Sequence, residues 1–474
     1  MAARRLAPEA GKARWETMTD SFDVDQLVDT DNGVISRELF VNRDIFEAEL
    51  ERVFTRAWLL VGHEGLIPEP DDYFVSRMGK DSVILTRNRQ NEIMVFLNSC
   101  PHRGMKVCRY DHGNEAVFTC PYHGWSFSTN RARVETPGQL VGVPHFEEGY
   151  SGRLDRVKWG LPRCPNVVNY KGSIWANWDP NPPAFEAYLG DMKLYLDTAL
   201  DHRDGTPGGS ELLGGVQKWR IRCNWKTVSE NFAGDLYHGI SHNSANLAQI
   251  GMSKGKGRRD ALPLRFAIGF DGLGHGGLGF PPSYEELPFV PDQYGDPEID
   301  AYHRDVRAAR ERNLGDRMRV GLVVGTIFPN MSFHADQPRS LAFAHPISET
   351  EVEMWRLYLV DADAPKPVKD MLRRYYLRYS GPGGMTESDD MENWTSVTAA
   401  SEGAIARRYG FNYQLGMGKE EPIEGLRGAV QSGNYSEGNA RIYYRRWAQF
   451  MKGMSWDDMS PPQSEVEAEA AHGD

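Results

Sequence analysis

Two short segments, each with one cysteine and one histidine, place the strongest constraint on how this chain can fold. The first reads Cys100-Pro-His102-Arg-Gly and the second reads Cys120-Pro-Tyr-His123-Gly-Trp. Because glycine and proline favour tight turns, we expect each segment to form a short loop between strands. If the two loops face each other, two thiolates and two imidazoles converge, which predicts a metal or an inorganic cluster.

The ligand types and their spacing decide between two kinds of centre. Two Cys and two His on paired loops match the ligands of a Rieske [2Fe–2S] cluster, in which His replaces Cys on one iron. The alternative is a zinc site with the same four ligands, but zinc fingers favour a Cys-x2–4-Cys pair followed by a His-x3–5-His pair. The Cys-x-His segment at Cys100 therefore favours the iron–sulfur cluster.

A second group of metal-ligand residues lies between Asn224 and His242. If this segment is one helix, Asp235, His238 and His242 share a face. Two imidazoles one turn apart can chelate a single ion, and such ligands suit iron, zinc or copper. The alternative is a polar helix with two unrelated histidines, so residues elsewhere in the chain must decide.

Charge and hydropathy exclude some partners and locations. A formal net charge of −12 argues against nucleic acid or an anionic membrane as a partner, because both favour clustered Lys and Arg. No apolar stretch is long enough to span a bilayer, and the start of the chain lacks the apolar core of a signal peptide. We therefore expect a cytoplasmic protein.

Hydrophobic patterning predicts an α+β chain with four parts. Residues 1–56 form an N-terminal segment in which Asn42 to Trp58 is an amphipathic helix that packs on a larger body. Residues 57–172 hold short alternating runs that indicate a small all-β domain around both Cys/His loops. Residues 173–460 form a second, larger domain, and residues 461–474 form an acidic tail without structure.

The two loops and the pattern Asn-Trp-Lys…Glu-Asn…Asp-x-x-His that begins at Asn224 resemble one known family. It is the large (alpha) subunits of Rieske non-haem iron aromatic-ring-hydroxylating dioxygenases, the naphthalene and biphenyl dioxygenase group. The resemblance runs from about Leu39 to Trp456. It implies an all-β Rieske domain followed by a catalytic domain with an antiparallel sheet flanked by helices, and it implies two cofactors, a [2Fe–2S] cluster and mononuclear Fe(II).

The resemblance also assigns the cluster ligands. Cysteines hold the inner iron in this family, and these are Cys100 and Cys120 here. Histidines hold the outer, solvent-near iron, and these are His102 and His123. Trp125 is then expected to shield the cluster.

The third ligand of the mononuclear iron must come from elsewhere, because an oxygen-activating iron with two His usually has one carboxylate. The candidates lie in Glu387-Ser-Asp-Asp390, where acids at the start of a helix also suit the helix dipole. The residues alone leave Asp389 and Asp390 nearly even. The resemblance places the ligand at Asp390, beside His238 and His242, and gives Asp389 a structural role.

Three further residues take roles from the resemblance. In the family, the aspartate that matches Asp235 bridges an iron-bound histidine, here His238, to a cluster histidine of a neighbouring subunit, here His123. A metal-bound His generally donates its second N–H to such a carboxylate. Asn231 is expected near the iron and Phe232 as a pocket wall, although ordinary core packing also accounts for Phe232.

One feature departs from the family. Many members place four or five residues between the two iron-binding histidines, on a distorted helix, whereas three separate His238 from His242. The i, i+4 spacing can still chelate an ion. The spacing alone therefore does not give the shape of the adjoining pocket or decide whether His242 is an iron ligand.

The glycine-rich stretch from Gly269 to Gly279 formally contains a dinucleotide fingerprint, Gly274-x-Gly276-x-x-Gly279. Phe-Pro-Pro follows it and cannot open a helix at a pyrophosphate, so the nucleotide interpretation fails. We expect a flexible loop near the substrate entrance instead. Without a flavin or nicotinamide motif, the chain must receive electrons from another protein.

The resemblance implies a terminal oxygenase that cis-dihydroxylates an apolar, polycyclic aromatic hydrocarbon with O2. It implies a small beta subunit, a ferredoxin with its NAD(P)H reductase as electron donor, and an α3β3 hexamer. Exposed cations beside the first loop are candidates for a ferredoxin patch: Arg103, Lys106 and Arg109. A Rieske monooxygenase or demethylase and a salicylate- or benzoate-type hydroxylase stay open. A plain Rieske electron carrier would leave roughly 300 residues without a role.

Overall fold

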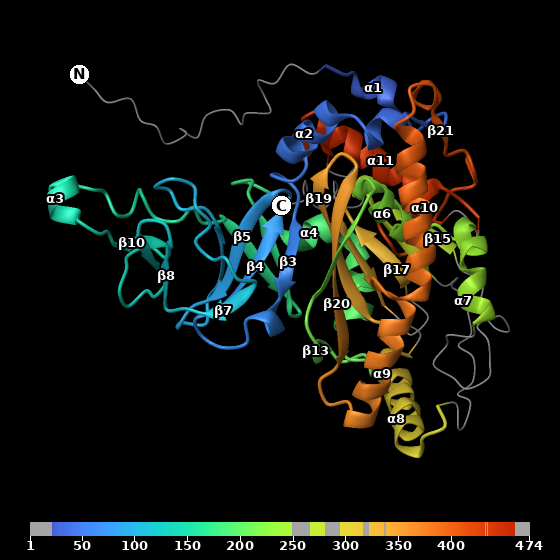
Figure 1. The fold of residues 1–474 in the computed structure, drawn as a ribbon. Coiled ribbons are helices and arrows are strands. Elements are labelled where there is room, and N and C mark those ends of the chain that lie inside the picture. The colour runs from blue at the N-terminus through green and yellow to red at the C-terminus, as the bar shows by residue number, and fades with distance from the viewer. Residues whose placement is uncertain are drawn as a thin grey trace, which may run out of the picture.

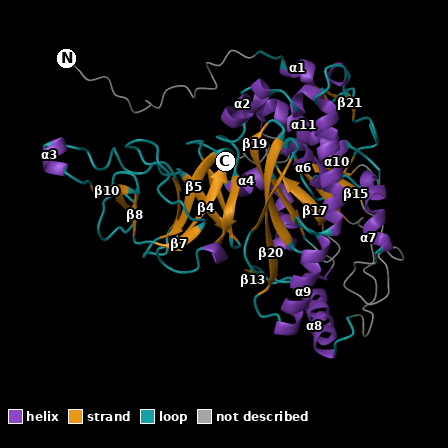
Figure 2. Ribbon diagram, in the orientation of Figure 1, coloured by secondary structure: helices purple, strands orange, loops and turns teal. Residues whose placement is uncertain are grey.

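The computed structural model describes residues 21–248, 266–279, 294–315, 322–335, 338–431, 433 and 435–459. Two bodies lie side by side in Figure 1, a smaller one rich in short strands and a larger one in which long strands pack against helices. Figure 2 shows that most helices belong to the larger body. The predicted α+β class and domain order are therefore confirmed. The predicted acidic tail lies outside the described residues.

The smaller body is built from three antiparallel sheets. Their strand orders are β6-β5-β4-β7, β10-β9-β8 and β11-β12-β3. The strands are β3 (Leu59–His63), β4 (Asp72–Met78), β5 (Asp81–Arg87), β6 (Ile93–Leu97), β7 (His112–Asn114), β8 (Val117–Thr119), β9 (Ser126–Ser128), β10 (Gln139–Gly142), β11 (Asn166–Tyr170) and β12 (Ser173–Asn177). Both Cys/His segments lie in loops of this body, as predicted.

The larger body is organised around one antiparallel sheet. Among the described residues its strand order is β13-β20-β19-β18-β17-β16-β15-β23-β22, with β14 also paired to β20. The strands are β13 (Ser210–Leu212), β14 (Gln217–Ile221), β15 (Phe266–Phe270), β16 (His275–Gly279), β17 (Leu322–Ile327), β18 (Met331–His334), β19 (Ser340–Ser348), β20 (Glu351–Asp361), β22 (Glu421–Pro422) and β23 (Ala429–Gln431). Neighbours from β15 to β20 follow chain order, so this part of the sheet is a meander.

Helices pack against this sheet and carry the residues of interest. Helix α6 (Trp225–Phe232) contacts β17, β18 and β19, whereas α11 (Gly438–Met451) contacts β15 and β16. Helix α9 (Lys366–Tyr379) leads into α10 (Met385–Ser401), which contacts the 3₁₀ helix η5 (Tyr237–His242) and α7 (Asn243–Leu247). At the far end, α8 (Pro297–Leu314) contacts α9.

The N-terminal segment joins the larger body through a buried polar cluster. The predicted helix forms as α2 (Arg43–Arg52) and is shorter than expected, because the chain leaves the helix before β3. Its Glu49 is fully buried and lies 2.6 Å from the Lys226 ammonium. The indole N–H groups of Trp225 and Trp447 also donate to Glu49, at 2.8 and 2.7 Å. Charge-assisted bonds of this kind tie α2 to α6 and α11.

The glycine-rich stretch is not a flexible loop, and that prediction was wrong. It forms the hairpin β15–β16 inside the sheet, and its strand β16 is buried. A Cβ atom at Gly269 would lie 2.6 Å from Ile442 of α11, and one at Gly276 would lie 2.8 Å from the carbonyl oxygen of Ala233. The glycines therefore serve the close approach of α11 and of the chain after α6. The Phe-Pro-Pro that follows lies outside the described residues.

Candidate metal centres

The two Cys/His loops are nearly identical turns. The Gly104 N–H donates to the carbonyl of Cys100 at 2.8 Å, and the Gly124 N–H donates to the carbonyl of Cys120 at 3.0 Å. Both glycines have φ +74°, a left-handed conformation that side chains other than glycine rarely adopt. The Cys-x-x-x-Gly and Cys-x-x-x-Gly-Trp patterns thus fix the backbone on which each cysteine and histidine sits.

The four side chains of these loops converge. The rings of His102 and His123 are 4.5 Å apart between centroids, and the thiols of Cys100 and Cys120 contact each other and are buried. Burial raises the pKa of the Cys100 thiol to about 11. Nδ1 of His102 is buried and has no hydrogen-bond partner among the described residues. Two buried thiols and an unpartnered ring nitrogen are donor atoms that a [2Fe–2S] cluster would satisfy, so the residues fit it.

Two aromatic side chains flank the histidines. The indole of Trp125 is buried and stacks on the ring of His102, with centroids 4.8 Å apart and planes 8° apart. Tyr122 is exposed, and its ring lies 3.7 Å from that of His123. The stacked indole covers one face of His102.

The second site is built on a broken helix, so the segment from Asn224 to His242 does not meet the condition of being one helix. Helix α6 ends at Phe232, and the 3₁₀ helix η5 (Tyr237–His242) follows after a turn in which Gly234 has φ +123°. Glycine adopts this conformation readily, so Gly234 permits the break. The shared helical face predicted for the acid and the two histidines does not exist, yet the turn still brings them together.

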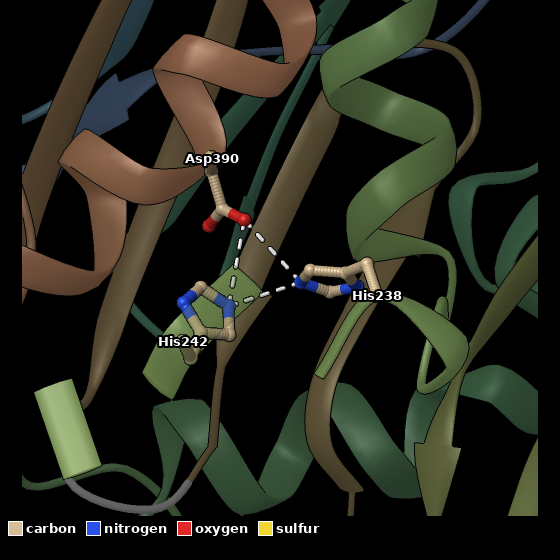
Figure 3. Close-up of side chains that lie close together, drawn as sticks. All are labelled: His238, His242 and Asp390. Atoms are coloured by element: carbon tan, nitrogen blue, oxygen red, sulfur yellow. Dashed lines mark hydrogen bonds and ion pairs between the residues drawn. The ribbon is translucent and has the colours of Figure 1, made fainter. Parts of the chain in front are cut away.

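Three side chains of this region point at one another (Figure 3). Nε2 of His238 and Nε2 of His242 are 3.0 Å apart, and Oδ1 of Asp390, from α10, lies 3.3 and 3.5 Å from them. Asp390 is buried, and its Oδ1 makes no hydrogen bond within the described part of the chain. Two imidazoles and one carboxylate with open positions are the facial triad typical of non-haem iron. The residues therefore fit a mononuclear iron.

Carboxylates make the His238 position strongly attractive to a cation. Burial lowers the pKa of His238, but the nearby carboxylates of Asp235 and Asp390, 3.4 and 3.3 Å from its two ring nitrogens, outweigh it and raise the pKa to about 10. Oδ2 of Asp235 lies 3.4 Å from Nδ1 of His238, and its Oδ1 accepts the backbone N–H of His238 at 3.2 Å. Burial raises the pKa of Asp235, but these contacts outweigh it and hold the pKa below its usual range.

Asp389 does more than the structural role expected of it. Its Oδ2 lies 3.3 Å from Nδ1 of His242 and accepts the hydroxyl of Ser244 at 2.7 Å. Asp389 therefore contacts Nδ1 of His242 in the same way as Asp235 contacts Nδ1 of His238. Carboxylates that bind the second ring nitrogen fix the tautomer and the orientation of a metal-bound histidine. The doubled aspartate was the signal in the sequence, but it did not say which acid faces which side.

Phe232 is buried next to the metal-site turn, among side chains that the sequence did not single out. Its ring is 5.3 Å from that of His334 and 6.2 Å from that of Trp394. The Arg356 guanidinium lies over it at 5.6 Å and pairs with Glu387 at 2.6 Å. A charged residue inside the apolar run Met-Trp-Arg-Leu-Tyr was a usable signal for Arg356, whereas His334 carried none.

Asn231 lies at the end of α6, where its carbonyl accepts the N–H of Asp235 at 3.1 Å. Its side chain is partly exposed, so the structure puts its backbone, rather than a side-chain contact, at the entry to the metal-site turn.

Among the described residues, one further group has metal-ligand types: His202, Asp361 and Asp363. Here Asp361 pairs with the buried Arg339 at 2.9 Å and accepts the hydroxyl of Tyr302 at 2.6 Å. The group is therefore part of an ion-pair network.

The Rieske non-haem iron oxygenases are a class defined by two features. One is a pair of Rieske-type Cys/His loops in an all-β body, and the other is a following site of two histidines and one carboxylate on helices over an antiparallel sheet. The comparisons agree with this class. The profile of the Rieske [2Fe-2S] domain matches residues 57–147, and that of the ring hydroxylating alpha subunit catalytic domain matches residues 210–453.

Two relatives and one solved structure place the chain more narrowly. The biphenyl dioxygenase alpha subunit of Paraburkholderia xenovorans is 36% identical over 96% of this chain and 98% of its own. The benzene 1,2-dioxygenase alpha subunit of Pseudomonas putida is 37% identical over 94% of this chain and 96% of its own. The structure of naphthalene 1,2-dioxygenase from Rhodococcus sp. bound to indole aligns with a TM-score of 0.74 and 32% identity, over 89% and 95% of the two chains.

The chain belongs to the family of ring-hydroxylating dioxygenase alpha subunits. It is an oxidoreductase whose cofactors are a Rieske [2Fe–2S] cluster and mononuclear iron. In the part of the chain that the structure describes, no helix is both long and apolar enough to cross a membrane.

Proposed function

We propose that this chain is the terminal oxygenase component that converts an apolar aromatic hydrocarbon to a cis-dihydrodiol. Both atoms of O2 enter the product, and two electrons and two protons complete the balance. The electrons come from NAD(P)H through a reductase and a ferredoxin. The relatives named for biphenyl, benzene and naphthalene support an apolar substrate, and the observation that carries the proposal is the convergence of His238, His242 and Asp390.

The ligand assignments are part of this proposal. Cys100, His102, Cys120 and His123 hold the cluster. His238, His242 and Asp390 hold the mononuclear iron by three donors from two elements, which leaves the other positions open. When bound, the two groups supply single electrons and the activation of dioxygen.

Phe232 forms one wall of the substrate pocket, and its surroundings keep it in place. The ring is buried between His334, Trp394 and the Arg356 guanidinium, so it has little freedom to move. A fixed apolar wall beside the three ligands orients an aromatic ring and excludes water. Asn231 opens the turn that carries the ligands.

Asp235 connects the mononuclear iron site of one copy of the chain to the Rieske cluster of a neighbouring copy. Figure 1 shows β8, next to the Cys120 loop, and α7 (Asn243–Leu247), next to His242, at opposite ends of the molecule. Because the cluster lies so far from the mononuclear iron of its own chain, electron transfer to the iron of another copy is favoured. The side chain of Asp235 is 41% exposed, so its carboxylate can contact His123 of a neighbouring copy while it holds His238.

This arrangement supports an α3β3 assembly with a small beta subunit, since a ring of alpha subunits gives each Asp235 one neighbouring cluster. Arg103, Lys106 and Arg109 are exposed beside the first cluster loop and form a basic patch for an acidic ferredoxin. We further propose the division into residues 1–56, 57–172, 173–460 and 461–474, with a cytoplasmic location.

A single-turnover experiment tests the proposed activity. Pre-reduced full-length protein with its beta subunit is mixed with oxygen-18 gas and a panel of fused-ring, biphenyl and carboxylated aromatics, and the products are read by mass spectrometry. Two labelled oxygens in a dihydrodiol are expected, and the variant His238→Ala is expected to give none. One labelled oxygen, or loss of a methyl group, would instead assign a monooxygenase or demethylase, and product from carboxylated aromatics alone would assign an aromatic-acid hydroxylase.

A further inference from the structure

The break between α6 and η5 leaves backbone carbonyl groups at the end of α6 that need hydrogen-bond donors. A helix that stops leaves its last carbonyl groups without partners inside the helix. Ala233 and Gly234 follow α6 directly and are buried. Buried carbonyl groups without a partner cost free energy, so something must bind them if the turn is to hold its shape.

The side chain of Asn439, on α11, meets this need. Its amide nitrogen donates to the carbonyl of Gly234 at 3.0 Å and also to the carbonyl of Ala233. Asn439 is itself only 3% exposed. An amide NH2 has two donors, which matches the two acceptors that it contacts.

The other side of the turn is closed by the hairpin β15–β16. A Cβ atom at Gly234 would lie 2.7 Å from the carbonyl oxygen of Gly277, and one at Gly276 would lie 2.8 Å from the carbonyl oxygen of Ala233 and 3.1 Å from Cβ of Asn439. The turn is thus enclosed between a glycine strand and α11. Close packing on both sides leaves the amide of Asn439 as the group that sets the direction in which the chain leaves α6.

We propose that Asn439 is a positioning residue for the mononuclear metal site, acting through the Ala233–Gly234 turn on His238 and His242. The inference rests on the proposed role of these two histidines as iron ligands. Asp235 and His238 come one and four residues after Gly234, so a change in the direction of the turn moves the first imidazole relative to Asp390. In the part of the chain that the structure describes, no hydrogen bond or ion pair joins Asn439 to His238, His242 or Asp390.

Three variants separate this role from ordinary packing. Asn439→Ala removes both donors, and Asn439→Asp keeps the shape but turns a carboxylate toward two carbonyls. Asn330→Ala is the matched control, because Asn330 is also buried and donates its amide to a backbone carbonyl, that of Ala344 at 3.0 Å, at a site between β17 and β18. A further variant, His238→Ala, tests the ligand assignment alone.

The measurements are made on the full chain with its beta subunit. Binding of Fe(II) to protein stripped of mononuclear iron gives the affinity, and the EPR spectrum of the nitric oxide adduct reports the ligand geometry. Hydrogen exchange of the metal-free protein over residues 233–242 reports the turn without iron. The visible spectrum of the Rieske cluster checks that the first domain is intact.

Both Asn439 variants are expected to weaken Fe(II) binding by roughly 10–100-fold, as loss of supporting hydrogen bonds does at metal sites. They are also expected to alter the nitric oxide EPR spectrum and to speed exchange over 233–242, whereas Asn330→Ala leaves all three unchanged. If the Asn439 variants bind iron as the unaltered protein does while His238→Ala does not, the positioning role is overturned. If His238→Ala still binds iron with an unchanged spectrum, the proposed ligand set fails instead.

Discussion

Oδ2 of Asp389 lies 3.3 Å from Nδ1 of His242, on the side of the ring away from Asp390. Asp235 stands 3.4 Å from Nδ1 of His238 in the same relation. Each of the two histidines thus has its own carboxylate behind it, while a third carboxylate faces both. This arrangement orients both rings toward one point and makes the site selective for a cation.

Asp389→Asn tests the carboxylate behind His242. The amide cannot accept the ring N–H with the strength of a carboxylate, so we expect Fe(II) affinity to fall roughly 10-fold to 100-fold with the cluster spectrum unchanged. Glu392→Gln, an exposed acid on the same helix, serves as the control. Equal iron affinity in all three proteins would show that His242 needs no such support.

Asp235→Asn tests the link between centres. The variant keeps a side chain that can accept the backbone N–H of His238 but loses the charge that faces Nδ1. We expect both metals to stay bound and dithionite still to reduce the cluster, while steady-state turnover falls by roughly 100-fold. Turnover near that of the unaltered enzyme would contradict a role for Asp235 between the centres.

Arg356→Met tests the buried pair behind Phe232. The change leaves the carboxyl of Glu387 buried without its partner, and breaking such a pair costs about 3–5 kcal/mol. We expect urea unfolding to show this loss, with much of it recovered in Arg356→Met/Glu387→Gln. Because Arg356 also lies against Phe232, the ratio of product regioisomers is expected to change in both variants; an unchanged ratio would separate Arg356 from the pocket wall.

His345→Phe tests a buried histidine at the contact between the two bodies. Burial, with the charges of Arg77 and Lys218, lowers its pKa to about 3, and neither ring nitrogen has a hydrogen-bond partner among the described residues. As the pH falls below about 6.5, the unfolded chain binds the proton before the folded one does. The stability from this neutral histidine is therefore present above that pH and is lost as the pH falls toward 3.

Phenylalanine keeps the stacking on Phe343 and the edge-to-face contact with Trp355 but has no proton to bind. As the pH falls, the free energy of unfolding is expected to decrease less steeply in His345→Phe than in the unaltered protein. The two slopes are expected to differ by up to about 1.4 kcal/mol for each pH unit between about pH 6 and pH 4. Urea unfolding at several pH values measures this difference. Parallel pH curves for the two proteins would mean that His345 is already protonated in the folded state.

Lys106→Glu tests the proposed ferredoxin patch. Reversing an exposed charge at an interface mainly slows association, so we expect ferredoxin to reduce the cluster roughly 10-fold more slowly, with a weaker salt dependence. Reduction by dithionite is expected to stay unchanged. Slower reduction by both agents would point to a damaged cluster loop instead of a docking role.

The short-range features of this protein could be predicted well. The strands around the cluster loops, the turns at Gly104 and Gly124 and the helix that became α2 each depend on residues close together in the chain. The family resemblance, carried by the same local patterns, was sufficient for the class of enzyme and its cofactors. The errors fell where a local pattern had two physical explanations, since glycines at 269–279 can mean either flexibility or close packing.

The sequence by itself determined which metal-binding groups are available. These are two thiols and two imidazoles in one pair of loops, and imidazoles with carboxylates in the second site. The reason is that ligand type and turn formation depend on residues close together in the chain. The family resemblance had already placed the ligand at Asp390. Only the tertiary structure decided that Asp389 contacts the other ring nitrogen of His242, that α6 breaks at Gly234, and that Asn439 from the far end of the chain binds the broken turn. The physical reason is that these outcomes depend on how α6, α10, α11 and β16 pack, and such contacts between distant segments leave no pattern in either segment alone.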